Sequence, residues 1–146
     1  MKELKSVKFE DIIECSKLYV NVFNKEPWND DWTIETANIR LKDIYNSPNF
    51  EGVLYIEEGV IRGAILGNYE QFYDGIHFIL KEMFICNELQ GKGIGSKMIE
   101  QFEKELLKNQ VTTIVLFTSK GDRTFSFYSK NGFEEFKSMA MMGKKL

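Results

Sequence analysis

The sequence has few of the residues from which metal centres and disulfide frameworks are built. Its 146 residues include one histidine, His77, and two cysteines, Cys15 and Cys86. Both cysteines lie within regular hydrophobic patterns instead of a spaced framework, so we expect reduced thiols. No combination of His, Cys, Asp and Glu has the spacing of metal ligands, and we therefore expect no metal.

Long apolar runs and a basic excess are also missing. No apolar run approaches the roughly 20 residues that span a bilayer, and residues 1–8 alternate charged with apolar side chains, unlike a signal peptide. We expect a cytoplasmic protein with no membrane partner. The net charge of −3 and the pI near 5.3 disfavour a nucleic-acid partner, because neutralising phosphates requires a dense basic surface.

Hydrophobic residues make up 43% of the chain and aromatic residues 14%, which is typical of a globular domain. We expect one domain over residues 1–146, of mixed α/β class. Gly63 and Gly67 indicate a bulge or a close backbone approach in their strand. The expected order is a strand at 4–8, helices at 9–24 and between Thr33 and Ser47, strands at 50–57, 60–69 and 77–86, a helix ending near 109, a strand at 112–117, a helix at 123–130, and strands at 133–137 and 138–142.

A glycine loop, Gln90 to Gly95, joins an apolar strand to an amphipathic helix. Amides freed by the glycines and by the first helical turn make such a junction an anion site. The loop is not a dinucleotide fingerprint, because Ser96 stands where the third glycine belongs. It is not a P-loop either, because Ser96 and Met98 replace the last glycine and the magnesium-binding hydroxyl.

The loop spells Q-x-x-G-x-G, and residues 127–133 read Phe-Tyr-Ser-Lys-Asn-Gly-Phe. In these two segments, and in the order of its elements, the chain resembles the Gcn5-related N-acetyltransferase (GNAT) family. The resemblance covers essentially the whole chain. It implies the GNAT fold: a central, mostly antiparallel sheet of about seven strands, splayed between strands 4 and 5 and flanked by about four helices.

The resemblance also implies acetyl-CoA as the cofactor. Its pantetheine arm would pair with the strand edge at Met83, Phe84 and Ile85, as an added strand does. The family often carries an asparagine seven residues before its tyrosine. Here that position is Gly121, and Thr118, Ser119 and Asp122 are the candidate substitutes. The pyrophosphate would lie on Gln90, Gly91, Lys92, Gly93, Ile94, Gly95 and Ser96, although Lys92 is equally consistent with an ordinary solvated lysine.

Two residues are candidate catalysts. Glu82 lies within an otherwise apolar strand where the family often places a glutamate, and it would deprotonate the acceptor amine directly or through water. Tyr128 matches the family tyrosine and would protonate the leaving thiolate. A backbone amide near Phe84 would stabilise the oxyanion. The alternatives are a solvated or salt-bridged Glu82 and a Tyr128 that only packs in the core.

The acceptor is expected at the loop between the first two helices, where acidic and aromatic residues alternate. Its candidate contacts are Trp28, Asp30, Asp31, Trp32 and, from a later turn, Tyr73. Acids and rings together suit a cationic amine, but a solvated acidic loop with stapling tryptophans explains the same residues.

The leading hypothesis is an N-acetyltransferase that acts on a primary amine of a small, cationic molecule. Peptide or protein N-acetylation, another acyl-CoA, and a non-catalytic acetyl-CoA-binding module are the alternatives, and a homodimer is left open.

Overall fold

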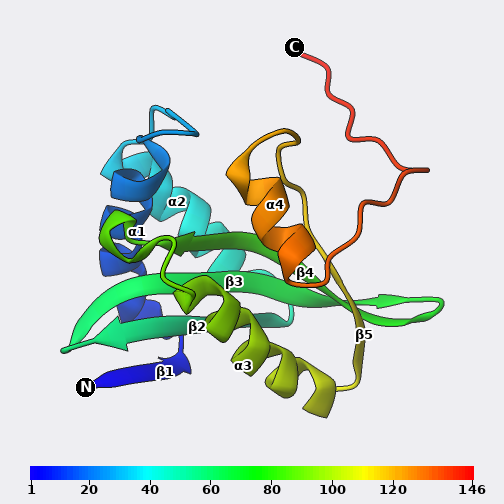
Figure 1. The fold of residues 1–146 in the computed structure, drawn as a ribbon, viewed down its shortest axis with the longest axis horizontal. Helices are drawn as coiled ribbons and strands as arrows, with labels where there is room; N and C mark the ends of the chain where they lie inside the picture. Colours follow the sequence, from blue (N-terminus) through cyan, green and yellow to red (C-terminus); the bar gives the residue numbers. More distant parts are fainter.

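The computed structural model, which describes residues 1–146, contains one five-stranded sheet in the order β1-β2-β3-β4-β5 (Figure 1). The fold is mixed α/β, as expected. The strands are β1 Lys2–Ser6, β2 Phe50–Glu57, β3 Val60–Phe72, β4 Gly75–Ile85 and β5 Val111–Val115. The helices are α1 Ile12–Phe23, α2 Ile34–Tyr45, α3 Ile94–Lys108 and α4 Arg123–Lys130, with short 3-10 turns at Phe9–Asp11 and Asn87–Leu89.

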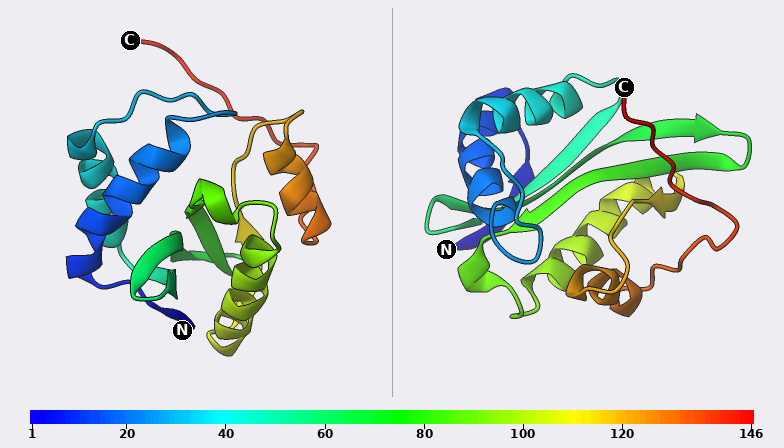
Figure 2. Two further views of the ribbon diagram at one scale, coloured as in Figure 1. Left: turned by 60° about the vertical axis from the view of Figure 1, so that its left-hand side comes forward. Right: turned by 90° about the horizontal axis from the view of Figure 1, so that it is seen from above.

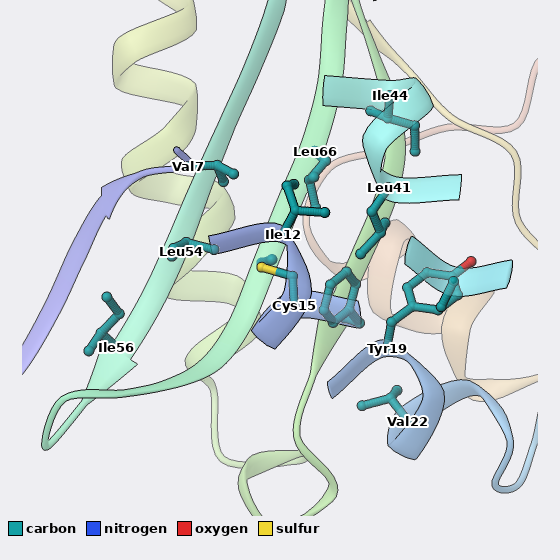
Figure 3. Packing of buried hydrophobic residues seen from close by; sticks show 13 residues of the cluster. Val7, Ile12, Cys15, Tyr19, Val22, Leu41, Ile44, Leu54, Ile56 and Leu66 are labelled. Atoms are coloured by element: carbon teal, nitrogen blue, oxygen red, sulfur yellow. The ribbon is translucent and has the colours of Figure 1, made fainter. Parts of the chain in front are cut away.

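The helices cover both faces of the sheet (Figure 2). Helices α1 and α2 pack on one face over a cluster that includes Ile12, Leu41 and Leu66 (Figure 3). Helix α3 packs on the other face through Met98 and Phe102. The expected N-cap of α2 is confirmed, because the Thr33 hydroxyl accepts a hydrogen bond from the amide of Thr36.

The sheet opens between β4 and β5, as the GNAT resemblance implies. Strands β1 to β4 pair antiparallel, whereas β4 and β5 are parallel and pair only from Ile76 to Ile79 on β4. Strand β4 continues to Ile85 without a partner on that side. The last residues of β4 therefore present an unpaired backbone edge on the side of β5.

A β-bulge at Lys81 determines which side chains of β4 face α1 and α2. Leu80 pairs with Gly67 and Glu82 pairs with Leu66, so Lys81 is the extra residue. Leu80 packs with the α3 cluster, while Phe84 packs with the α1 and α2 cluster. Without the bulge, the alternation of the strand would turn Glu82 to the opposite face.

Gly67 makes this bulge possible, which confirms the close approach expected from the sequence. A Cβ atom at Gly67 would lie only 2.0 Å from the carbonyl oxygen of Ile79 and 2.7 Å from the Phe78 ring. No side chain fits there while the backbone of β4 keeps its course.

The strands expected at 133–137 and 138–142 are absent, so the sheet has five strands and the expected number was wrong. Phe133 is half-buried, but Phe136, Met139, Met141 and Met142 are exposed. A turn forms instead, in which the amide of Met139 donates to the carbonyl of Phe136. A short hairpin with so little apolar surface against the core is not stable by itself. No helix of the structure is long and apolar enough to cross a membrane.

Candidate active site

A cavity of about 470 Å³ lies where β4 separates from β5. The unpaired end of β4 supplies Met83, Phe84 and Ile85 to its wall, and the glycine loop and α4 supply most of the rest. Most of the predicted cofactor residues therefore meet in one place. The lining residues from the loop and α4 are Gln90, Gly91, Gly93, Gly95, Ser96, Arg123, Thr124, Phe127, Tyr128 and Lys130.

The backbone edge of β4 presents free donors to this cavity. The Cys86 amide donates to the Arg62 carbonyl in β3, and the amides of successive residues in a strand point in opposite directions. The Ile85 carbonyl accepts a hydrogen bond from the Gln90 side chain, on the side away from β3. The open edge therefore carries the amides of Met83 and Ile85, which flank Phe84, the residue near which the oxyanion donor was expected.

The glycine loop needs its glycines for two different reasons. Gly91 and Gly93 have φ values of 76° and 80°, in the left-handed region that favours glycine. At Gly95, a Cβ atom would lie 2.9 Å from the Phe127 ring and 3.0 Å from the Ile85 side chain. Gly95 thus lets α3 approach α4 and β4 closely.

The loop and the start of α3 fit a phosphate group. The first helical hydrogen bond of α3 runs from the Lys97 amide to the Gly93 carbonyl, so the amides before Lys97 are not used by the helix. The Thr124 hydroxyl, on the cavity wall, is buried without a hydrogen-bond partner. Such an orphaned group is expected where a polar ligand binds.

Arg123 was not foreseen from the sequence. Its Nη2 atom donates to the Gln90 side-chain oxygen at 3.1 Å and to the Glu26 carbonyl at 3.3 Å, and its guanidinium lies 6.0 Å from the Trp28 ring centre. Gln90 itself is fully engaged, because its amide nitrogen donates to Ile85 and to Asn87. Gln90 therefore holds Arg123 at the cavity instead of offering a free side chain.

Three predicted cofactor residues do not line the cavity. Lys92 is exposed at the tip of the loop, and Ile94 is half-buried at the start of α3. Thr118 also lies outside the lining, but its hydroxyl is buried without a hydrogen-bond partner.

Glu82 lies on the other side of β4, below α1 and α2. Its Oε2 atom accepts hydrogen bonds from the Tyr19 hydroxyl at 2.7 Å and from Arg40 Nε at 3.1 Å, and its side chain is 14% exposed. Burial raises the pKa of Glu82, Tyr19 and Arg40 lower it, and the charge of Asp30 raises it. The net effect is a raised pKa, which brings this carboxyl closer to neutral pH.

Tyr19 and Arg40 were missed because they come from α1 and α2, far from Glu82 in sequence. Tyr19 is buried, and burial and the neighbouring Glu82 raise its pKa, so its hydroxyl stays protonated as a donor. Figure 3 shows that hydroxyl directed away from Ile12 and Cys15. The one advance signal was Arg40 itself, a charged residue beside the buried positions Ala37 and Leu41 of an amphipathic helix.

Tyr128 lies on the cavity side and is only 8% exposed. Its ring packs edgewise against Phe127 and Phe133. Burial is the larger cause that raises the pKa of Tyr128, and the charge of Glu82 raises it further. The hydroxyl is therefore protonated at neutral pH, and the field of Glu82 reaches it across the end of β4.

The loop between α1 and α2 brings both tryptophans toward β4. Trp28 lines the cavity and packs against Phe23, whereas Trp32 packs edgewise on Tyr19, 5.0 Å between ring centres. Asp30 accepts a hydrogen bond from Trp32 Nε1 at 3.1 Å. Asp31 is exposed and makes no side-chain contact of this kind.

Tyr73 lies far from the loop between α1 and α2, with which it was expected to bind the acceptor. It is fully exposed at the tip of the β3–β4 hairpin, the opposite end of β4 from Met83. His77 lies near that tip, stacked on Phe72 and bonded to Asp74 at 2.9 Å. No group of three or more His, Cys, Asp or Glu side chains converges in a metal-binding arrangement.

Comparison with known proteins identifies the family. Residues 49–135 match the family described as "Acetyltransferase (GNAT) domain". No curated protein sequence matches the chain significantly. A possible acetyltransferase from Clostridium difficile 630 has a similar structure, with a TM-score of 0.83 and 14% identity over 100% of this chain and 98% of that one.

Two further structures with this fold are aminoglycoside acetyltransferases. One, meta-AAC0020 from an uncultured soil metagenomic sample in complex with sisomicin, has a TM-score of 0.76 and 17% identity over 99% of this chain and 96% of that one. The other, AAC(6')-Iy in complex with CoA, has a TM-score of 0.76 and 12% identity over 100% and 96%. At these identities the likeness establishes the fold, and the family match covers more than half of the chain: this protein belongs to the GNAT acetyltransferase family.

Proposed function

We propose that this protein transfers the acetyl group of acetyl-CoA directly to a primary amine of a small molecule. One observation carries the proposal. The unpaired end of β4 has the glycine loop and Tyr128 on its cavity side and a half-buried carboxylate, Glu82, on its other side. A site for an acyl donor and a base for an amine thus lie at one strand end.

The cavity offers the contacts that acetyl-CoA needs. The open edge at Met83 and Ile85 would pair with the pantetheine amides, and the amides before Lys97 would receive the pyrophosphate. Arg123 would add a charge-assisted contact to the phosphates. The thioester of acetyl-CoA supplies the activated acetyl group.

Glu82 is the proposed base. An alkylamine has a pKa of about 10.4 and is almost wholly protonated at neutral pH. The raised pKa of Glu82 makes it a better proton acceptor than an exposed glutamate. Its Oε2 atom is held by Tyr19 and Arg40, and Oε1 is left to accept the proton, directly or through one water.

The open β4 edge and Tyr128 would serve the rest of the reaction. An edge amide, at Ile85 or Met83, would donate a hydrogen bond to the carbonyl oxygen of the acetyl group, where negative charge develops during transfer. The raised pKa of Tyr128 keeps its hydroxyl protonated at neutral pH, and this hydroxyl would donate its proton to the CoA thiolate as it leaves. Neither Cys15 nor Cys86 is required, and both are buried free thiols.

A small acceptor whose amine arrives as a cation is favoured by the acidic and aromatic loop between α1 and α2. Asp30 acts electrostatically on Glu82, and Trp28 reaches the cavity. Structures of this fold include an acetyltransferase bound to sisomicin, which is an aminoglycoside. Peptide N-acetylation and transfer from another acyl-CoA remain alternatives within the same chemistry.

The release of free thiol from acetyl-CoA, measured across a panel of amines, tests this proposal. We expect one or more amines to accelerate release and acetyl-CoA to raise the melting temperature. Suppose that no amine accelerates release while acetyl-CoA still raises the melting temperature. The protein would then be an acetyl-CoA-binding module, and the enzymatic proposal would be wrong.

A further inference from the structure

Arg40 has donor groups that the protein itself does not use. Its Nε atom is hydrogen-bonded to Glu82 Oε2 at 3.1 Å, and the guanidinium also lies close to the Tyr19 hydroxyl, but neither Nη group has a hydrogen bond of good geometry to the chain. The side chain is 41% exposed, so these groups can be reached from solvent. Beside a half-buried base, an open guanidinium fork is a ready site for an anion.

A role in holding Glu82 in place does not explain the presence of Arg40 beside it. The Tyr19 hydroxyl already binds the same oxygen at the shorter distance of 2.7 Å. A guanidinium lowers the pKa of Glu82 and so makes it a weaker base, which opposes the role proposed for it. Arginine and carboxylate groups also prefer two parallel hydrogen bonds, yet this pair has one.

The groups that surround Glu82 come from four elements. They are Tyr19 on α1, Arg40 on α2, Asp30 in the loop between them, and Tyr128 on α4. Arg40 is the only cation among them. An acceptor whose amine approaches Glu82 therefore meets one positive group, and an acceptor with a second positive charge at that spot would be repelled.

We propose that the acceptor is an amine with a carboxylate close to its nitrogen, such as a free amino acid, and that the Nη groups of Arg40 bind this carboxylate. The proposal rests on the proposed acetyl transfer and names its substrate class. The ammonium end is attracted by Glu82 and Asp30, and the carboxylate end by Arg40. A zwitterion thus fits both signs of charge around the site.

Matched acceptors test the proposal. For each of several amino acids, kcat/KM for acetyl transfer is compared with that of its amide and of its decarboxylated amine. We expect the free amino acid to be preferred by about 10- to 100-fold, the range for a charge-assisted hydrogen-bonded contact. In Arg40→Gln this preference should vanish, whereas Arg40→Lys should retain part of it.

Lys42→Gln is the matched control. Lys42 is also a cation of α2, but it lies over the Phe9 ring, away from Glu82. This variant should keep the full preference for the free amino acid. The same preference in Arg40→Gln and in the wild type would overturn the proposal. An equal loss in Arg40→Gln for all three acceptors, or a wild-type preference for the decarboxylated amine, would overturn it as well.

A failure of acetyl transfer gives a different result from a failure of this proposal. If no amine is acetylated, binding of an amino acid and of its decarboxylated amine to the CoA-saturated protein is measured by calorimetry. Tighter binding of the amino acid, lost in Arg40→Gln, would support the Arg40 site without the reaction. Equal binding of the two ligands, or no binding of either, would overturn it.

Discussion

Replacing Tyr19 by Phe should change the pH dependence of catalysis and little else. The Tyr19 hydroxyl donates to Glu82 Oε2 at 2.7 Å, and Phe removes only that oxygen. The ring contacts remain possible, with centres 4.6 Å from Phe23, 5.0 Å from Trp32 and 5.3 Å from Phe84. The variant therefore isolates one hydrogen bond to the proposed base.

The sign and the size of the effect follow from that bond. Donation to a carboxylate favours its charged form, so the Tyr19 bond lowers the pKa of Glu82, and its loss raises that pKa further. A hydrogen bond to a charged group contributes about 1.5–3 kcal/mol. Arg40 stays bound to the same oxygen, so we take the lower end, which corresponds to about one pH unit at 1.36 kcal/mol per unit.

The assay is the pH profile of kcat/KM for the amine at saturating acetyl-CoA. The base is active as the carboxylate, so activity falls as the pH drops through the pKa of Glu82. In Tyr19→Phe this acidic limb should move up by about one pH unit. Tyr69→Phe, which loses the hydroxyl that accepts from Asn109, should leave the limb in place. An acidic limb of Tyr19→Phe at the wild-type pH, or at a lower pH, would refute the reasoning.

Three other substitutions probe the parts of the site separately. Gly67→Ala should lower the free energy of unfolding by about 2–4 kcal/mol, because the added carbon meets the Ile79 carbonyl oxygen at 2.0 Å. Thermal denaturation measures this against the control Gly143→Ala, which lies in the exposed C-terminal segment. Equal melting temperatures of the two variants would contradict the prediction. Gly93→Val should weaken CoA binding about tenfold or more, because its φ of 80° is strained for a β-branched residue; unchanged affinity in calorimetry would remove the loop from the cofactor site. Arg123→Gln should weaken CoA binding by about tenfold, and a wild-type dissociation constant would leave Arg123 with a structural role alone.

Local sequence signals predicted much of this fold. The glycine loop before α3, the Thr33 cap of α2 and the helix Arg123–Lys130 follow from short-range chemistry, and each is present. The strand Phe50–Glu57 follows from its pattern, as does most of Val60–Phe72, which was expected to end at residue 69. The family resemblance added the opening between β4 and β5, which β4's apolar pattern alone does not reveal.

What the sequence did not predict depends on contacts between distant segments. The pairing of Glu82 with Tyr19 and Arg40 joins three elements, and no spacing in the chain indicates it. The bulge at Lys81 changes which residues of β4 face α1 and α2, and the sequence pattern of the strand does not indicate this change. The sequence placed Tyr73 with the acceptor loop because it is aromatic and near acids, but β4 separates the two.

The two expected strands after α4 illustrate a different limit. Phe133, Phe136, Met139 and two later methionines make the segment after α4 partly apolar, and this is what the prediction of strands followed. A strand also needs a partner edge and a surface to cover, and this segment stays exposed. Local pattern predicts a strand without testing either requirement.

The account as a whole depends on Glu82 acting as the base beside an acetyl-CoA site. The most direct test is the turnover of Glu82→Gln at saturating acetyl-CoA, with the affinity for CoA measured on the same preparation. The account predicts a fall in kcat of about 10²- to 10⁴-fold with an affinity for CoA close to that of the wild type. Wild-type turnover in Glu82→Gln would contradict it.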